Sequence, residues 1–319
     1  MKKTKKIIFI IALLAMVLGG AILMASLIAI NFDFTKMDTG VYVDRSYELD
    51  SIPVAISVNV NTAKVEIVKS TDGKCRVEIH ERENITHTVS ENNGELKISV
   101  VGTRKWYENI GINLKEIKIT LYLPEGSYNY LKIRTDTGDA TVSDGFLFDT
   151  IILNGDTADF ELFSGAVNKL EAETDTGSVA VDGTGGRVSI NTDTGNITIR
   201  SSSCAGIGIE TDTGRITMEN VNCEFLKIDS DTGKAVLKSV IATGRFDIES
   251  DTGDISFDGC DAEEISIETD TGDVEGTVLT DKTFVARSRT GDVWVPRDTV
   301  GGKCYINSST GDIELSVKK

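Results

Sequence analysis

From residue 131 onward, apolar and polar residues alternate in short runs that repeat along the chain. The runs meet at a five-residue phrase, Thr135-Asp136-Thr137-Gly138-Asp139, whose equivalents recur about every 19 residues. With the Gly taken as position 0, positions −7 and −5 before it and +2 and +4 after it are apolar. Alternation of this kind predicts strands with one buried face, and a fixed period of this length predicts a solenoid. Position 0 is filled in turn by Gly138, Ala158, Gly177, Gly195, Gly214, Gly233, Gly253, Gly272, Gly291 and Gly311.

The repeat predicts an all-β fold, a single-stranded parallel β-solenoid of right-handed sense with about 19 residues per coil over residues 131–319. The alternation breaks at positions 0 and +1, so we expect a two-residue corner there. Gly would supply a positive φ at this corner. Position −1 is always Thr, and its parity predicts an inward row of stacked hydroxyls, whereas position −2 should point outward.

Residues 51–130 are predicted to form irregular N-terminal coils with a capping loop, preceded by a polar stalk over 31–50. Val54, Ile56 and Val58 alternate with polar residues, as a half-buried strand does. The phrase around Ala63 and the one around Gly94 both fit the repeat, so each is interpreted as a degenerate coil. Another alternating strand follows over 117–123.

The first thirty residues predict a transmembrane anchor. An uncharged run over 7–30 follows four Lys residues, and as a helix it would be about 36 Å long, enough to cross the roughly 30 Å hydrocarbon core. The Lys residues predict a cytoplasmic tail over 1–6 and an extracytoplasmic remainder. The competing interpretation is a cleaved signal peptide, whose apolar region is usually shorter. We therefore expect a single-pass protein of the cell membrane, N-terminus in and C-terminus out.

The charge of the chain excludes one class of partner. The formal net charge is −17, and because residues 1–30 carry four Lys and no acid, the rest carries 29 basic and 50 acidic side chains. Such a surface repels nucleic acid, so no nucleic-acid binding is expected, and it favours cations or basic partners. Five Cys with no CxxC argue against a zinc site. Three of them, Cys204, Cys223 and Cys304, fall in apolar slots of the repeat, which predicts small core residues, and a Cys204–Cys223 disulfide between neighbouring coils is the alternative.

The outward Asp residues at position −2 are the first candidate site. Stacked about 4.8 Å apart, these carboxylates repel by about 1 kcal/mol per neighbouring pair even in water. The plain interpretation is that each binds corner N–H groups and is screened by salt. The alternative is a ladder of Ca²⁺ ions, which prefer oxygen ligands; no other cofactor is expected. The candidate ligands are Asp136, Asp156, Asp175, Asp193, Asp212, Asp231, Asp251 and Asp270.

A second candidate is the loop that interrupts the N-terminal pattern. It brings Arg104, Lys105, Trp106 and Tyr107 together, and Trp106 is one of only two Trp in the chain. Loops on a rigid scaffold often carry function, which makes these four residues candidates for binding a partner. The alternative is an apolar lid over the open end of the solenoid, because terminal repeats need capping.

No catalytic motif is recognisable. The chain has two His residues, no HExxH, no nucleophile elbow and no Walker loop. Paired carboxylates occur throughout the Asp ladder, so no single pair stands out. We expect a protein that is not an enzyme, with a carbohydrate-active β-helix enzyme as the remote alternative, since fold alone assigns no activity.

The repeated Thr-Asp-Thr-Gly-Asp phrase, and the strand that ends Ile119-Thr120-Leu121-Tyr122-Leu123-Pro124, are similar to those of the bacterial β-strand-repeat family of "putative adhesins". The resemblance covers roughly residues 50–319. It implies surface attachment to an envelope protein or surface polymer, and no catalytic residues come with it. The expected function is a non-enzymatic, membrane-anchored envelope interaction module. The alternative is a structural or sensory component of a cell-envelope stress system that acts through a membrane partner.

Overall fold

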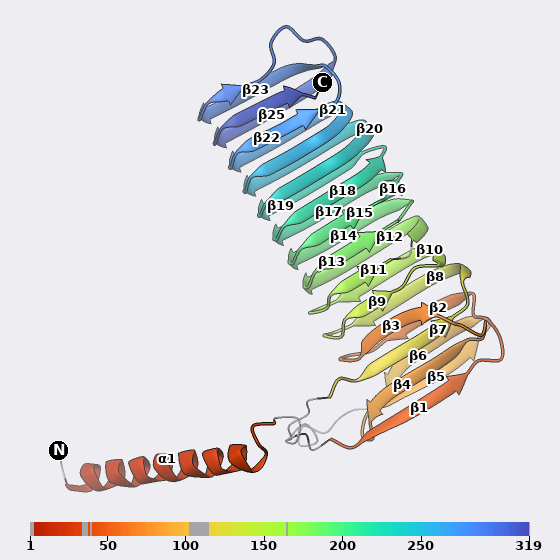
Figure 1. Cartoon of the computed structure of the whole chain (residues 1–319), viewed down its shortest axis with the longest axis vertical. Helices are drawn as coiled ribbons and strands as arrows, with labels where there is room; N and C mark the ends of the chain where they lie inside the picture. The colour runs from red at the N-terminus through yellow and green to blue at the C-terminus, as the bar shows by residue number, and fades with distance from the viewer. Residues whose placement is uncertain (1–2, 34–37, 39, 102–114, 164, 319) are drawn as a thin grey trace.

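The computed structural model describes residues 3–33, 38, 40–101, 115–163 and 165–318. One helix, α1 (Lys3–Ala29), stands apart from the strands in Figure 1. Its stretch Lys6–Ala29 contains an 18-residue window with a mean hydropathy of 3.0 and no residue buried in the protein, so by length and composition it could cross a membrane. The predicted N-terminal apolar helix is therefore present.

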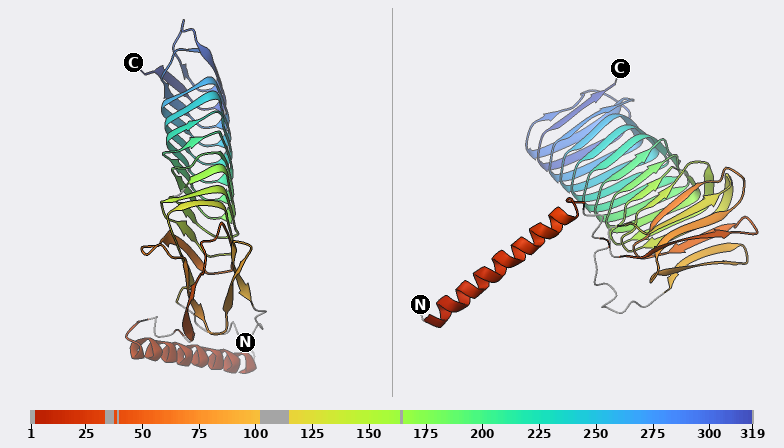
Figure 2. Two further views of the ribbon diagram at one scale, coloured as in Figure 1. Left: turned by 90° about the vertical axis from the view of Figure 1, so that its right-hand side faces the viewer. Right: turned by 60° about the horizontal axis from the view of Figure 1, so that its bottom comes forward.

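The remainder is a β-solenoid, as predicted, in which all strands belong to one 26-stranded sheet. Each coil has a long strand, the corner at position 0 and a second strand, so two stacks of strands enclose the core (Figures 1 and 2). The strands of each stack are parallel except at the N-terminal end, where β4 and β5 run antiparallel to their neighbours. In spatial order, the first stack contains β5 (Thr86–Asn92), β6 (Glu95–Val101), β2 (Ala55–Asn59), β8 (Gly126–Thr135), β10 (Phe146–Gly155), β12 (Gly165–Thr176), β14 (Arg187–Thr194), β17 (Gly206–Thr213), β19 (Leu226–Thr232), β20 (Ala235–Thr252), β21 (Ile255–Thr271), β25 (Gly302–Thr310) and β23 (Lys282–Thr290).

The second stack runs alongside the first. The long strands β20 and β21 run without a break through the turn that joins the second strand of one coil to the first strand of the next, and so belong to both stacks. Beside them, in spatial order, the second stack contains β1 (Tyr42–Glu48), β4 (Arg76–Arg82), β7 (Lys118–Leu123), β3 (Lys64–Lys69), β9 (Ala140–Val142), β11 (Phe160–Leu162), β13 (Val179–Asp182), β15 (Ile197–Arg200), β18 (Ile216–Cys223), β22 (Val274–Val278), β26 (Ile313–Val317) and β24 (Val293–Trp294), with the short β16 (Ser203–Cys204) paired to β18.

The predicted apolar slots form the core. In the coil around Gly214, Ile207 and Ile209 lie before the corner and Ile216 and Met218 after it, and each is at most 1% exposed. Burying one such side chain stabilises the fold by about 1.5–3 kcal/mol. Because every coil repeats these slots in register, the core is one continuous column along the solenoid.

The inward hydroxyl row lies at position −3, and the prediction that Thr at −1 points inward is wrong. Thr174 and Thr192 at −3 are 1% exposed, whereas Thr176 and Thr194 at −1 are exposed. The cause is a skip in strand pairing: Thr174 pairs with Thr192 and Thr176 with Thr194, and Asp175 is passed over. The skip changes the parity of the strand, so positions −2 and −1 both face water.

Glycine at position 0 is required mainly because neighbouring coils approach closely there. A Cβ added to Gly214 would overlap the carbonyl oxygen of Gly195 in the preceding coil. The predicted positive φ is found only at the later corners, from 145° to 156°, and not at Gly177, Gly195 or Gly214. The glycine N–H of most later corners donates to the carbonyl of Thr at −1 in the adjacent coil, as Gly195 does to Thr213 at 3.0 Å. The glycines that do so are Gly177, Gly195, Gly214, Gly233, Gly253, Gly272 and Gly311.

A second corner at position +6 was not recognised in the sequence. Ser201, Asn220 and Ser239 have left-handed φ values of 47°, 55° and 53°, and Gly183 and Gly259 have φ of 77° and 63°. Asn and Gly tolerate this conformation best, and Ser occupies it here as well. This corner, not the one in the repeated phrase, is where the chain turns through the left-handed region.

Two N-terminal predictions are corrected by antiparallel pairing. The stalk is wrong over Tyr42–Glu48, because β1 pairs with β4 as an edge strand. The coil assigned to Gly94 is also wrong: Asn93 (φ 53°) and Gly94 (φ 79°) form the tight turn of a hairpin between β5 and β6. The N-terminal coil instead combines β6 with β7, while the coil around Ala63 is confirmed.

At both ends of the solenoid the coils are stacked out of chain order. The coil of β2 and β3 comes first in the sequence but lies between that of β6 and β7 and that of β8 and β9. The coil of β25 and β26 comes last but lies between β21 and β23, as Figure 1 shows. The terminal coil at this end is therefore β23 with β24.

All five cysteines are free and buried, as expected of small apolar core residues. Cys204 and Cys223 are neighbours in register in β16 and β18, without a bond between them. Burial raises the pKa of Cys204 and Cys304 to about 12, and that of Cys75, Cys223 and Cys260 to about 11.

We therefore expect no thiol of the folded protein to react with an aromatic disulfide reagent at pH 8, because only the thiolate is nucleophilic. All five should react in guanidinium chloride. Because the pKa is raised in the folded state, stability is complete below the unfolded thiol pKa near 8.5–9 and declines as pH rises toward 11–12. Rapid labelling of native protein would contradict this expectation.

Candidate functional site

Two parallel rows of acidic side chains run along the outer face of the first stack. The row at position −2 consists of the eight predicted Asp residues, which are exposed except for the half-buried Asp136. A second row at position −4, not noticed in the sequence, lies beside it in register. Its acidic members are Glu173, Glu210, Asp229, Glu249 and Glu268. The pair of rows forms what we call the acidic face.

The −2 carboxylates do not build the corner, contrary to their plain interpretation. The side chains that cap the corner are those at +1. Asp139 Oδ1 accepts the Asp159 N–H at 3.0 Å, and Asp273 Oδ1 accepts that of Asp312 at 2.8 Å. Position +1 thus joins coil to coil, whereas the −2 carboxylates project into solvent.

The hypothesis of a calcium ladder gains no support from the arrangement of the carboxylates. Within the described residues, no three Asp, Glu, His or Cys side chains gather closely enough to hold one metal ion. Ca²⁺ takes six to eight oxygen ligands, which a single file of carboxylates on parallel strands does not converge to provide. The ladder therefore stays a prediction from the sequence.

The different roles of the two Asp rows predict opposite effects of neutralisation. Asp212→Asn should raise the free energy of unfolding by about 0.5–1 kcal/mol at low salt, because it removes repulsion from neighbours along the row. The gain should fade in 1 M NaCl. Asp254→Ala should lower stability by a similar amount, since Asp254 Oδ1 accepts the Asp273 N–H at 3.3 Å and Ala has no acceptor to replace it. Urea unfolding at both salt concentrations would measure this, and equal signs for the two variants would contradict it.

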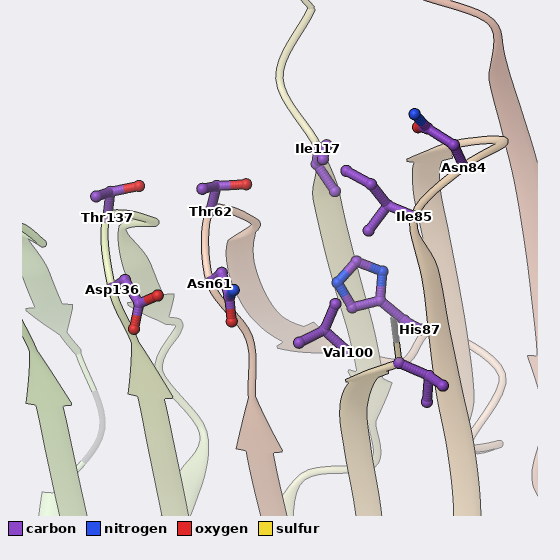
Figure 3. Close-up of a pocket in the computed structure, with 10 residues that line it drawn as sticks. Asn61, Thr62, Asn84, Ile85, His87, Val100, Ile117, Asp136 and Thr137 are labelled. Atoms are coloured by element: carbon purple, nitrogen blue, oxygen red, sulfur yellow. The ribbon is translucent and has the colours of Figure 1, made fainter. Parts of the chain in front are cut away.

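The predicted partner-binding residues Arg104, Lys105, Trp106 and Tyr107 lie outside the described residues. The segment over 102–114 is flanked by Val101 and Lys115. Val101 lines a pocket of about 350 Å³ at the N-terminal end of the acidic face. Asp136 and Thr137 contribute one wall, and Asn61 and Thr62 from the neighbouring corner lie beside them (Figure 3).

The opposite wall of this pocket carries the buried His87. Figure 3 shows its imidazole beside Ile85, Val100 and Ile117. His87 is 2% exposed and its Nδ1 lies 2.7 Å from Oε2 of Glu81, which is fully buried. Arg45 Nε lies 2.6 Å from the other carboxylate oxygen, as an ion pair without hydrogen-bond alignment.

This Arg45–Glu81–His87 network links the end of β4 and the start of β5 to the edge strand β1. The His87 backbone N–H also donates to Glu81, at 2.8 Å. A buried carboxylate with partners on both oxygens is held in place, and its loss would leave unpaired groups in an apolar setting. We interpret the network as structural. The sequence offered one signal for it, the two His residues in the irregular region.

The acidic face ends at a change of charge. In the terminal coil, Arg287 and Arg289 occupy the −4 and −2 rows. Arg289 Nη2 donates to Ser309 Oγ at 2.8 Å, and Ser309 Oγ donates in turn to Asp270 Oδ1 at 3.4 Å. The change from Asp to Arg at position −2 is visible in the sequence. In the structure, the coil of β25 and β26, which carries Ser309 and which we call the inserted coil, lies between Asp270 and Arg289.

Comparison with protein families gives a match over most of the chain. The model of a family described as Toastrack DUF4097 matches residues 54–234 and 186–319. No curated protein matches the chain.

Several solved structures resemble the fold. One, described as a "putative adhesin" from Bacteroides fragilis, has 16% identity and a TM-score of 0.41, and the match covers 86% of this chain and 97% of that one. A second, described as a "putative lipid binding protein" from Parabacteroides distasonis, has 14% identity, a TM-score of 0.38 and coverages of 88% and 98%. A third, a "putative adhesin" from Parabacteroides distasonis, has 13% identity, a TM-score of 0.38 and coverages of 86% and 98%.

Proposed function

Since this chain belongs to the Toastrack DUF4097 family and carries an apolar helix ahead of its solenoid, we propose that it is a membrane-anchored, extracytoplasmic interaction module without catalytic activity. The four Lys residues before the helix favour a cytoplasmic N-terminus. The solenoid then stands outside the membrane, where its faces meet other envelope components.

The observation that carries the proposal is the acidic face. Its carboxylates are exposed and lie in register over many coils. They are not needed to hold the corners together, because the side chains at +1 accept the hydrogen bonds there. Rows of like charge lower stability through repulsion, so their persistence over many coils favours a role in binding. A rigid acidic strip fits a basic protein segment or a cationic polymer of the envelope, and attraction over such a strip speeds encounter.

Neutralising part of the acidic face should weaken this binding. The test uses the full chain in lipid nanodiscs and a fluorescein-labelled oligolysine as the cationic probe. A variant in which four outward carboxylates become amides should bind about ten-fold more weakly at low salt, since each lost ion pair costs a few tenths of a kcal/mol. The four substitutions are Asp175→Asn, Asp193→Asn, Asp212→Asn and Asp231→Asn.

A matched variant has the same net charge but leaves the acidic face intact. Its substitutions fall on exposed acids elsewhere in the solenoid: Glu161→Gln, Glu224→Gln, Glu263→Gln and Glu275→Gln. Binding by this control should stay within two-fold of the unaltered chain. If both variants lose affinity equally, the probe senses net charge alone and the acidic face is not the binding surface.

A further inference from the structure

The solenoid ends in an unpaired edge. Among the described strands, β23 pairs only with β25 and β24 only with β26. Figure 1 shows β23 beyond β25, at the end of the stack farthest from the N-terminal strands. An edge strand presents free N–H and C=O groups and can accept another strand.

The core is also unfinished at this edge. In the inserted coil, Cys304 and Ile306 at −7 and −5 are fully buried. Their neighbours in the terminal coil, Phe284 and Ala286, are only half-buried. Beside them on the outer face, Val285 is 42% exposed. A further strand with apolar residues at the same two slots would cover Phe284 and Ala286 as the coils inside the solenoid cover one another.

The charge of the edge indicates which residues should follow the two apolar ones in the added strand. Arg287 and Arg289 stand in the two rows that are acidic in the body of the solenoid. Arg289 meets the Ser309 hydroxyl on its inner side, and Arg287 is in register with Asn307, so neither contacts a carboxylate of the inserted coil. Opposite charges on adjacent strands stabilise pairing by roughly 0.2–1 kcal/mol, and like charges oppose it.

We propose that β23 is a docking strand for an extended, acidic segment of a partner protein. The segment adds in parallel, places two alternating apolar residues over Phe284 and Ala286, and sets an acidic residue beside each of Arg287 and Arg289. Its pattern is apolar-x-apolar-acid-x-acid, which the repeat itself carries in Ile265-Ser266-Ile267-Glu268-Thr269-Asp270.

A second copy of this chain is a poorer occupant. Two copies meeting end to end would bring four Arg residues together, and the acidic strands of the solenoid are already paired on both sides. The docking strand and the acidic face have opposite charge and lie on different coils, so the two proposals do not depend on each other.

The test uses fluorescein-labelled peptides and the full chain in lipid nanodiscs. The acidic probe is the sequence of residues 263–273, and its counterpart carries Glu268→Lys and Asp270→Lys. We expect saturable binding of the acidic probe and at least ten-fold weaker binding of the lysine-substituted one. The protein variant Arg287→Glu with Arg289→Glu should reverse this preference, and that reversal identifies the edge. Arg134→Glu with Arg215→Glu, equal in charge but within the solenoid, should keep the original preference.

Any one of three binding results would overturn the proposal. These are no saturable binding of the acidic probe, equal binding of both probes, or a preference left unchanged by Arg287→Glu with Arg289→Glu. Circular dichroism and an unaltered melting temperature establish that each variant is folded. Light scattering over a range of concentrations tests the second copy: a dimer that the acidic probe fails to dissociate would assign the edge to self-association and overturn the proposal.

Discussion

Replacing Gly214 by Ala is expected to lower the free energy of unfolding by about 3 kcal/mol or more, at the upper end of what an overpacked site costs. The added Cβ would overlap the backbone carbonyl oxygen of Gly195, and a backbone carbonyl cannot turn aside as the end of a flexible side chain can. The same shift would strain the hydrogen bonds that Gly195 and Gly214 donate to Thr213 and Thr232, both at 3.0 Å.

The matched control lies in the same coil. Gly208 is in β17 and has nothing within 4 Å of the position that a Cβ would take. Gly208→Ala should leave stability unchanged or raise it by up to about 1 kcal/mol, because Ala has less freedom to lose on folding. Urea unfolding followed by circular dichroism measures both variants. Equal stability of the two would show that close stacking at the corner is not the reason for glycine.

Replacing Lys282 by Met is expected to lower the free energy of unfolding by about 3–5 kcal/mol, since breaking a buried ion pair leaves a charge uncompensated. Lys282 is 3% exposed, and its Nζ lies 2.5 Å from Asp261 Oδ1, 2.6 Å from the Ala262 carbonyl and 2.9 Å from Thr280 Oγ1. The other carboxylate oxygen of Asp261 is buried without a hydrogen bond and would have no charge partner left.

Hydrogen exchange locates the effect as well as measuring it. Because Lys282 begins β23 and Asp261 lies in β21, we expect Lys282→Met to speed exchange in the last coils and to leave the coils around Gly195 unaffected. Lys227→Met is the control, because Lys227 is exposed and its nitrogen lies 3.6 Å from Asp229; it should cost less than about 1 kcal/mol. Uniform acceleration along the chain would contradict a local role for Lys282.

The architecture could be predicted from the sequence because the same pattern of apolar and polar residues recurs in every regular coil. Each coil carries the same four apolar slots, so a strand assignment that failed in one coil would be corrected by the next. The parity error at Thr176 and Thr194 has a specific cause. Pairing skips Asp175, and a skip leaves no trace in a pattern whose neighbours on both sides are Thr.

The order of coils could not be predicted, and the reason is physical. Ile265 and Ile267 in β21 find an equivalent surface on Phe284 and Ala286 or on Cys304 and Ile306, since both coils present the repeat. Local pattern therefore permits either order. The choice is made by long-range contacts such as Lys282 reaching Asp261, and a buried Lys cannot be told from a surface Lys in a single sequence.

The candidate site was half visible in the sequence. The Asp row at −2 is part of the repeated phrase and is easy to find. The row at −4 mixes Glu, Asp and Asn, as at Glu210, Asp229 and Asn191, so it has no single-letter signature. The reach of Glu81 to both Arg45 and His87 depends on the antiparallel strands β1 and β5, which replaced a predicted stalk and a predicted coil.

The out-of-order stacking at the end of the solenoid has a mechanical consequence. A pulling force applied beyond Val317 enters through β26, which is held by β22 on one side and β24 on the other. Removing an edge strand breaks the pairing on one side only, whereas drawing β26 out requires both ladders to slide at once. If the molecule is tethered through α1 and pulled at its far end, β26 would therefore resist extraction by shear of both ladders at once. The solenoid would not unfold by peeling one coil after another from its end.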